Sequence, residues 1–265
     1  MKLLASDFDN SLWFSDHMQK KDVKAIKRFQ KHRHLFGLCS GRSLEGVLRP
    51  SQKYGLNYDF YILLSGGIIY NKNKEIIFEK KIPISIVKDI YDFVDRPNIT
   101  IVNDNQTYMM NTSKKAKMRG ILIGSFEEIG SDEINAFSFH YSLDEIDKVK
   151  HITFDINEKY SDYVEAFQNN QHIDLVAKGC SKGNGIAFIK DYYHLEDDDI
   201  YGIGDSWNDI PMLKSVTHGY SFTYAPLEVQ DFAEGIVHNL AECIGEIDKN
   251  NKIFVFFQKR KKNFL

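Results

Sequence analysis

The chain has 265 residues, of which 43% are hydrophobic and 27% charged, as in an ordinary globular protein rather than a disordered one. Its formal net charge of −3 gives no general electrostatic basis for binding nucleic acid or an anionic membrane surface. The N-terminus reaches acidic residues after a short apolar run, so we expect neither a signal peptide nor a membrane span. Cys39, Cys180 and Cys243 have no zinc or disulfide spacing and indicate reduced thiols in a cytoplasmic protein.

The first third of the chain alternates strand-like and helix-like patterns. The opening apolar run stops at acids, which is typical of a buried parallel strand. Val23, Ile26 and Phe29 have the spacing of one helical face. The predicted elements are strands at 3–8, 35–39 and 59–64, helices at 22–34 and 43–52, and a hairpin at 68–78.

The pattern changes from about residue 82. Short strand candidates now alternate with helical candidates, which predicts an α+β unit built on a small open sheet. The predicted strands are 99–103, 106–111, 136–141 and 151–156, and the predicted helices are 84–94, 142–150 and 160–170.

The first pattern returns after about residue 176. The predicted helices are 183–193 and 207–214, and the predicted strands are 200–203, 218–222 and 234–240. The two ends of the chain therefore predict one doubly wound α/β domain, interrupted by an insertion. In such sheets ligands bind beyond the carboxyl ends of the strands, where the polar clusters of this chain lie.

Two of these clusters lie in the first part of the chain. Asp7 and Asp9 leave a strand two positions apart, so their carboxylates can share one site with a cation between them. One can serve as nucleophile and the other as general acid and base; the alternative is a turn with exposed acids. Ser40, Gly41 and Arg42 follow the next strand, where a hydroxyl and backbone amides can hold a phosphate or merely cap a helix.

Two more clusters lie in the last part. Lys182 opens a predicted helix and can balance a group of aspartates, although such a lysine is more often solvated. Asp205 and Asp209 are four positions apart, so one helical turn brings them to the same side. Acids without basic neighbours in sequence favour a hard divalent cation, Mg²⁺ above all, over a simple capped helix.

The order of these clusters, DxDxS, SGR, K-G and GDxxND, resembles the haloacid dehalogenase-like superfamily, and within it the Cof-type hydrolases. The resemblance runs from Leu3 to about Ile244. It implies a Rossmann-like core formed by residues 1–81 and 176–265, with an α+β cap domain of residues 82–175 inserted between the second and third motifs. The 140 positions from Arg42 to Lys182 leave room for such a cap.

The resemblance also implies roles for the acids. Asp7 would be the nucleophile and a ligand of Mg²⁺. Asp9 would protonate the leaving oxygen and then activate water, while its backbone carbonyl touches the metal. Asp205 would bind Mg²⁺, and Asp209 would bind it directly or support that site.

The remaining motif residues are implied to bind the phosphate. Ser40 and Lys182 would grip the phosphoryl group that is transferred. Gly41 and Arg42 complete the loop at the second strand end, and Asn208 would lie near the phosphate.

We therefore predict a Mg²⁺-dependent phosphatase that hydrolyses small phosphorylated metabolites (sugar phosphates, nucleotides or vitamin phosphates) through an aspartyl-phosphate on Asp7. A phosphomutase would share these residues but would need a second phosphate site in the cap, where Arg96 and Arg119 are the only arginines. A non-enzymatic phospho-acceptor module is about half this length and lacks an acid equivalent to Asp9. Oligomeric state is not predicted.

Some residues outside the motifs also matter. Ser65-Gly66-Gly67 stands where the family commonly has Asn-Gly-Ala, and Trp207 either shapes a pocket or packs in the core. We expect the tail, 253–265, to be a docked or solvated terminus. Four histidines have no metal spacing, and we expect structural or surface roles for them: His17, His34, His140 and His151.

Overall fold

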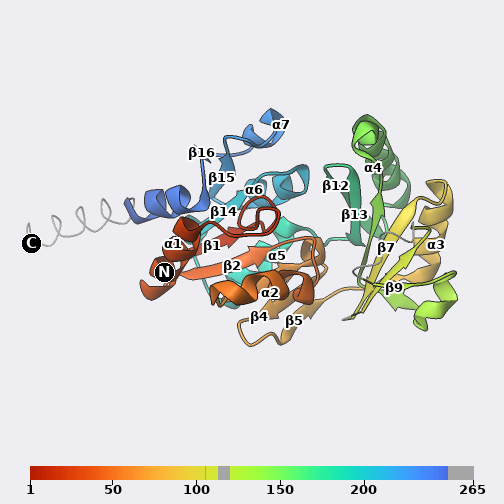
Figure 1. Cartoon of the computed structure of the whole chain (residues 1–265), viewed down its shortest axis with the longest axis horizontal. Coiled ribbons are helices and arrows are strands. Elements are labelled where there is room, and N and C mark those ends of the chain that lie inside the picture. Colours follow the sequence, from red (N-terminus) through yellow and green to blue (C-terminus); the bar gives the residue numbers. More distant parts are fainter. Residues whose placement is uncertain (105, 113–119, 250–265) are drawn as a thin grey trace, which may run out of the picture.

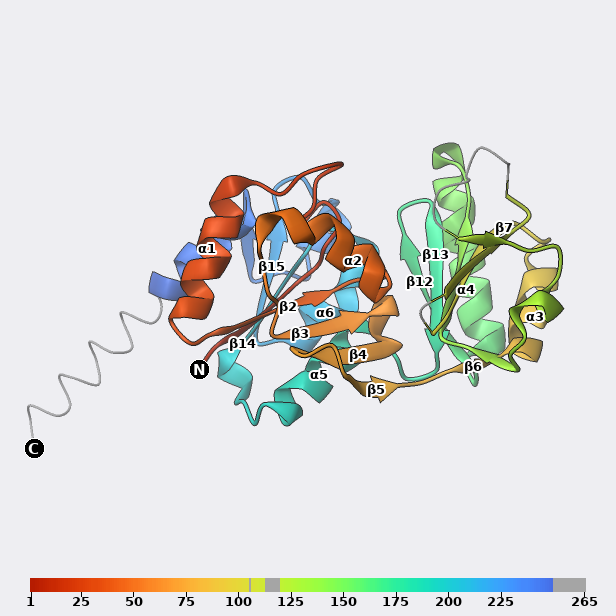
Figure 2. The ribbon, with the colours of Figure 1, turned by 60° about the horizontal axis from the view of Figure 1, so that its bottom comes forward.

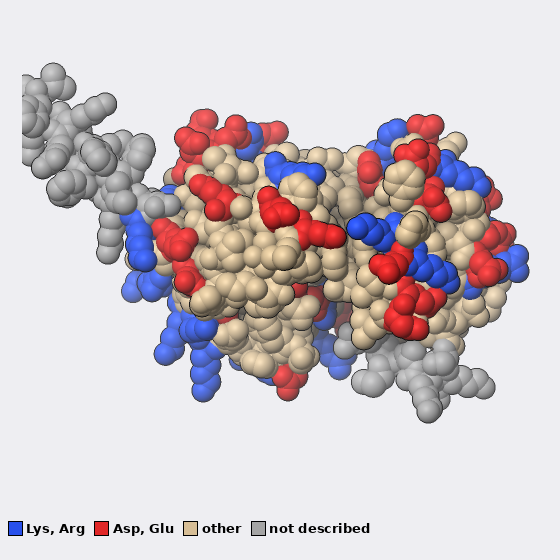
Figure 3. Space-filling model, turned by 90° about the horizontal axis from the view of Figure 1, so that it is seen from above, with Lys and Arg blue, Asp and Glu red and all other residues tan. Residues whose placement is uncertain are grey.

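The structure is a computed structural model that describes residues 1–104, 106–112 and 120–249. It has two lobes side by side (Figure 1). Within the described residues, no helix combines the length and the apolar character needed to span a bilayer. The tail 253–265 and Arg119 lie outside the described residues. On the face seen in Figure 3, acidic and basic side chains are interspersed over both lobes.

The larger lobe is built on an eight-stranded sheet of order β16-β15-β14-β1-β2-β3-β4-β5. The six strands from β16 to β3 are parallel, and β4 and β5 add an antiparallel edge. The strands are β1 (Leu3–Ser6), β2 (Leu35–Cys39), β3 (Phe60–Leu63), β4 (Ile68–Asn71), β5 (Ile76–Glu79), β14 (Ile200–Gly204), β15 (His218–Phe222) and β16 (Gly235–Val237).

Both faces of this sheet are covered by helices. The alternation along β1 divides the core, because Leu4 packs with Ile26 of α1 (Lys20–Lys31) whereas Leu3 and Ala5 pack with Ile186 of α5 (Lys182–Tyr192). The first face also takes α2 (Leu44–Ser51), and the second also takes α6 (Ile210–Ser215). Each fully buried aliphatic side chain contributes roughly 1.5–3 kcal/mol. The predicted doubly wound core is confirmed.

The smaller lobe, the cap, is built on a six-stranded sheet of order β12-β13-β11-β7-β8-β9, inserted between β5 and α5. Its strands are β7 (Asn98–Asn103), β8 (Gln106–Met110), β9 (Ile121–Leu122), β11 (Ala136–His140), β12 (Val164–Asn169) and β13 (His172–Ala177). A two-stranded sheet joins β6 (Ile82–Pro83) to β10 (Glu133–Ile134).

Two helices cover one face of the cap sheet, α3 (Ile84–Phe93) and α4 (Ile146–Tyr160). Phe139 of β11 stacks on Tyr91 of α3 with ring centroids 6.4 Å apart. Asn157 of α4 exchanges two hydrogen bonds with the backbone of Ala166 on β12. The strands β12 and β13 lie next to the core (Figure 2).

Two predictions in the cap are wrong. Residues 151–156 lie within α4 rather than in a strand, and most of residues 160–170 form the strand β12 rather than a helix. Val149, Ile156 and Tyr160 are buried on one face of α4, whereas Phe154 is 63% exposed. The β-branched residues of the segment favour a strand locally, and tertiary packing overrides that weak preference.

A tight turn after β3 positions the start of α5. Ser65 has φ of 50° and Gly66 has φ of 97°, both in the left-handed region. A Cβ at Gly66 would lie 2.2 Å from the carbonyl oxygen of Ser181. Ser181 caps α5, where its side chain accepts a hydrogen bond from the Asn184 amide. The turn therefore abuts the residue that precedes Lys182.

We expect Gly66→Ala to lower the free energy of unfolding by about 2–4 kcal/mol, since it adds both backbone strain and a steric clash. Urea denaturation of the purified variant measures this. Gly130→Ala is a matched control, because Gly130 also has a left-handed φ, 67°, but nothing lies within 4 Å of its Cβ position. A loss at Gly66 no larger than that at Gly130 would contradict the close packing.

Candidate active site

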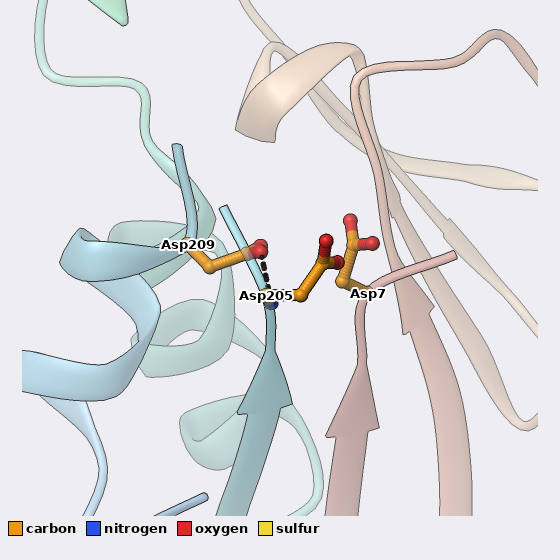
Figure 4. A group of neighbouring side chains, drawn as sticks. All are labelled: Asp7, Asp205 and Asp209. Carbon is orange, nitrogen blue, oxygen red and sulfur yellow. Dashed lines mark hydrogen bonds between the residues drawn. The ribbon is translucent and has the colours of Figure 1, made fainter. Parts of the chain in front are cut away.

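Three carboxylates converge at the carboxyl end of the core sheet. Asp7 follows β1 and Asp205 follows β14, and these strands are parallel neighbours. Asp209 lies in the short 3₁₀ turn Trp207–Asp209, which precedes α6. One carboxylate oxygen from each of the three lies within 4.8 Å of the others (Figure 4). Strand order, rather than sequence proximity, brings them together.

Lys182 lies among these acids. Its Nζ is 2.6 Å from Asp7 Oδ1 and 2.5 Å from Asp209 Oδ1. The side chain is fully buried, so these contacts are little screened by water. Asn208, also buried, accepts a longer hydrogen bond of 3.5 Å from the same Nζ. The lysine thus bridges the loop after β1 and the turn after β14.

Asp209 and Ser11 form hydrogen bonds that fix the position of Asp205. The Oδ2 atom of Asp209 accepts hydrogen bonds from the amides of Asp205 and Ser206, both at 2.9 Å. With Lys182 on Oδ1, both oxygens of Asp209 have partners. Ser11 donates from its hydroxyl to Asp205 Oδ1 at 3.0 Å. Asp7 and Asp205 are therefore the acids with the freer oxygens.

The protonation of the cluster follows from its burial and its excess of negative charge. Burial, with the neighbouring Asp209 carboxylate, raises the pKa of Asp205 to about 7. The same two causes raise the pKa of Asp7 well above its ordinary value. Burial alone would lower the pKa of Lys182, but the carboxylates of Asp209 and Asp7 hold it well above its ordinary value. The lysine stays protonated.

The residues present fit a divalent cation. Three carboxylates and one ammonium leave a formal charge of −2, and a cation of charge +2 would offset it. The free donors are oxygens only, which suits Mg²⁺ rather than a thiolate- or imidazole-binding metal. The pKa values of Asp7 and Asp205 are raised because negative charge is unfavourable in this buried group, and a bound cation would relieve that cost.

Asp9 does not join the buried group. Arg42 binds it bidentately, with Nε 2.7 Å from Oδ2 and Nη2 2.6 Å from Oδ1. The guanidinium also lies 5.2 Å from the ring centroid of Phe8. The Asp9 side chain is 47% exposed, against 8% for Asp7. The second acid of the motif is therefore half exposed, and Arg42 contacts that acid rather than the buried cluster.

The loop after β2 lies beside this group. Ser40 is buried, and its hydroxyl accepts a hydrogen bond of 3.2 Å from the Arg42 amide. Its carbonyl accepts another from the Ser65 amide. A Cβ at Gly41 would lie 3.0 Å from Asp174 Oδ2, on cap strand β13. The predicted phosphate loop is thus in contact with the cap.

Two features near the site could not be read from the sequence: the place of Asp174 and the partners of Trp207, which we expected either to shape a pocket or to pack in the core. Asp174 carries no motif, and only the sheet register places it. Trp207 donates from its indole nitrogen to Glu228 of α7 (Leu227–Gln230) at 2.7 Å. Lys150 of cap helix α4 lies 3.7 Å from the same carboxylate. These residues join the fourth motif to the cap, and no local pattern connects segments so far apart.

Comparisons with known proteins agree with this geometry. The family model of haloacid dehalogenase-like hydrolases matches residues 4–243. A Haemophilus influenzae protein provisionally named a phosphatase is 25% identical over 238 residues, which cover 88% of this chain and 90% of that protein.

Solved structures share the fold at low sequence identity. A haloacid dehalogenase-like hydrolase from B. subtilis has a TM-score of 0.81 at 16% identity, over 91% of this chain and 96% of that one. The subclass IIB sugar phosphatase BT4131 has a TM-score of 0.77 at 19% identity, over 96% of this chain and 99% of that one. With the family model spanning nearly the whole chain, the protein is an enzyme that belongs to the Cof-type haloacid dehalogenase-like hydrolases.

Proposed function

We propose that the protein is a Mg²⁺-dependent phosphatase of small metabolites that works through an aspartyl-phosphate on Asp7. The observation that carries this is the buried group of Asp7, Lys182, Asp205 and Asp209 at the carboxyl end of the sheet. Phosphoryl transfer needs an in-line nucleophile and neutralisation of charge around the phosphate, and this group offers both. Family membership agrees with the assignment.

In the first step an oxygen of Asp7 attacks phosphorus, and the bond from phosphorus to the ester oxygen breaks. Asp9 gives its proton to that leaving oxygen, and the alcohol departs. In the second step Asp9 takes a proton from water, whose oxygen attacks phosphorus and releases phosphate from Asp7. A carboxylate nucleophile thus divides one difficult hydrolysis into two easier displacements.

Other residues prepare these steps. Lys182 and Asn208 would bind the phosphoryl oxygens, and so would Ser40 and Gly41 of the loop after β2. When bound, Mg²⁺ would supply positive charge that stabilises the transferring group. Asp7 and Asp205 would hold it through their carboxylates and Asp9 through its carbonyl, while Asp209 orients Asp205 and Lys182. Arg42 donates to both carboxylate oxygens of Asp9. For Asp9 to transfer a proton to the substrate, Arg42 would have to release at least one of these oxygens.

The direct test is release of inorganic phosphate by the purified protein from a panel of phosphorylated metabolites and an aryl phosphate. We expect release with Mg²⁺ and none with a chelator in excess. No release from any compound, with the protein folded and Mg²⁺ bound, would reject the proposal and favour the mutase or phospho-acceptor alternatives.

We expect Asp9→Asn to slow turnover by about 10²- to 10⁴-fold, the usual range for general acid–base catalysis, because an amide cannot supply the proton. The loss should be larger for alkyl phosphates, whose leaving oxygen needs the proton, than for an aryl phosphate. Steady-state rates measure both. Asp16→Asn, an exposed acid nearby, is the control. Near-normal turnover of alkyl phosphates by the Asp9 variant would remove this role.

We keep three further assignments as proposals. The first is a core domain of residues 1–81 and 176–265 with a cap domain of residues 82–175; the two sheets support this division of the described residues, except that cap strand β13 continues to Ala177, two residues past the proposed boundary. A cytoplasmic location is supported by three free, buried cysteines in a fold that leaves them unpaired. The substrate is a small phosphorylated molecule enclosed between cap and core, where exclusion of water favours the first displacement.

A further inference from the structure

The turn that carries Asp9 has an uncommon backbone conformation. Asn10, the next residue, has φ of 57°, in the left-handed region that glycine adopts more readily than other residues. Its N–H donates to the carbonyl of Trp13 at 2.8 Å, and the Trp13 N–H donates to the carbonyl of Phe8 at 2.7 Å. Such conformations persist where the surrounding contacts fix them. The position of the proposed general acid therefore depends on what holds Asn10.

A tyrosine from a distant segment binds the other side of this residue. The Tyr224 hydroxyl donates a hydrogen bond to the carbonyl oxygen of Asn10, although the two residues are 214 positions apart in the chain. Tyr224 lies in the loop between β15 and α7. Asn10 thus has a hydrogen bond within the turn at its N–H and one to the loop after β15 at its carbonyl.

Ring contacts fix the direction of the Tyr224 hydroxyl. The ring stacks on Phe222 of β15, with centroids 5.0 Å apart and planes inclined by 14°. It also meets the ring of Phe14 edge to face, with centroids 6.5 Å apart. The Ala225 N–H donates to the carbonyl of Phe222 at 3.0 Å, which closes the backbone around Tyr224. Because a tyrosine side chain has only two torsions, these contacts leave its hydroxyl pre-organised to donate.

The charge around this hydroxyl keeps it a donor. Partial burial, with the negative charge of Asp205 and Asp7, raises the pKa of Tyr224 above its ordinary value. The hydroxyl is therefore protonated at neutral pH. The carbonyl of Asn10 can only accept a hydrogen bond, so the protonated form is the one that can bind it.

Asn10 lies between two residues of the site. Ser11 donates to Asp205 Oδ1 at 3.0 Å, and Arg42 binds both carboxylate oxygens of Asp9. For proton transfer Arg42 would have to release one of these oxygens, whereas a bond to the backbone of Asn10 can persist through the reaction. The backbone bond is thus a restraint on Asp9 that remains while its carboxyl acts.

We propose that Tyr224 is a positioning residue, whose hydrogen bond to the Asn10 carbonyl keeps Asp9 in place to protonate the leaving oxygen. This rests on the phosphatase function proposed above and deepens it. When Arg42 releases Asp9, Tyr224 still holds the turn, so the carboxyl meets the ester oxygen without a search among turn conformations. Tyr224 acts through Asn10 rather than on the substrate.

The test uses two esters of similar shape, phenyl phosphate and 4-nitrophenyl phosphate. The leaving oxygen needs a proton more in phenol than in 4-nitrophenol. With the full chain and saturating Mg²⁺, we expect Tyr224→Phe to lower kcat/KM for phenyl phosphate by about 3- to 10-fold, the worth of one hydrogen bond. The loss for 4-nitrophenyl phosphate should stay below about twofold, because a good leaving group needs little acid catalysis.

A double variant separates positioning from general damage. Asp9→Asn has no proton to deliver, so adding Tyr224→Phe to it should cause no further loss on phenyl phosphate. Tyr192→Phe is the matched control, because Tyr192 is 44% exposed, against 48% for Tyr224, and lies at the opposite end of α5 from Lys182. The control should leave kcat/KM unchanged for both esters.

Three results would overturn this inference while the phosphatase function stands. The first is an equal loss on both esters in Tyr224→Phe, which would mean a structural role. The second is no loss on phenyl phosphate, and the third is a loss that persists undiminished in the Asp9→Asn background. Absence of phosphate release from every compound, 4-nitrophenyl phosphate included, would instead reject the phosphatase function and this inference with it.

Discussion

We expect Asp7→Asn to abolish turnover of every phosphate ester while the protein remains folded. The amide is nearly the same size as the carboxylate but cannot form the acyl-phosphate bond, so no covalent intermediate accumulates. Phosphate release measures turnover, and mass spectrometry of the quenched wild-type reaction detects the added phosphoryl group on the peptide that contains Asp7. Wild-type-like release by the pure variant would exclude Asp7 as nucleophile.

The same variant has a second expected result, in stability. The folded state raises the pKa of Asp7 through burial and the Asp209 carboxylate. A carboxyl whose folded pKa is raised loses stability as the pH rises from its ordinary pKa to the raised one. Without added metal, Asp7→Asn should therefore be as stable as the wild type or more so at neutral pH, and less sensitive to pH. A large loss of stability would mean that Asp7 is needed for folding.

We expect Lys182→Met to lose turnover and also to lower the free energy of unfolding by about 3–5 kcal/mol, the usual range when one partner of a buried ion pair is removed. Methionine can occupy the space of the lysine stem, so the loss reports charge rather than volume. Lys182 Nζ contacts Asp7 and Asp209, and its removal takes from these buried carboxylates the cation with which both are paired. Urea denaturation in the presence of chelator measures the loss.

The pH dependence of this loss has a definite sign. In the variant the carboxyl pKa values rise further, so the folded state binds more protons than the unfolded state and stability falls as pH rises. The deficit relative to wild type should thus be larger at about pH 8 than at about pH 5.5. Lys190→Met, on the same helix but partly exposed and ion-paired with the exposed Asp197, is the control. A deficit independent of pH would point to packing instead.

The sequence predicted the core far better than the cap, and the reason is physical. Core strands such as residues 35–39 are short apolar runs that end at polar motifs, and each is followed by a helical period. In the cap, the segment 151–156 carries β-branched and aromatic residues that suit either state. It becomes helical because Val149 and Ile156 pack under the sheet, a contact that local preference does not contain.

The members of the candidate site could be predicted from sequence alone. Asp7, Lys182, Asp205 and Asp209 are indicated by type and order, and parallel strands with neighbouring carboxyl ends bring such residues together wherever the intervening chain runs.

The partners that surround these residues could not be predicted in this way and follow from the folded arrangement. It pairs Arg42 with Asp9, sets the buried Ser65 hydroxyl beside Gly41, and brings Asp174 of the cap against the same loop. Asp174 is more than a hundred residues from that loop in the chain. Such contacts depend on strand register and on the docking of two domains, which arise from packing over the whole surface and leave no local signal in the sequence.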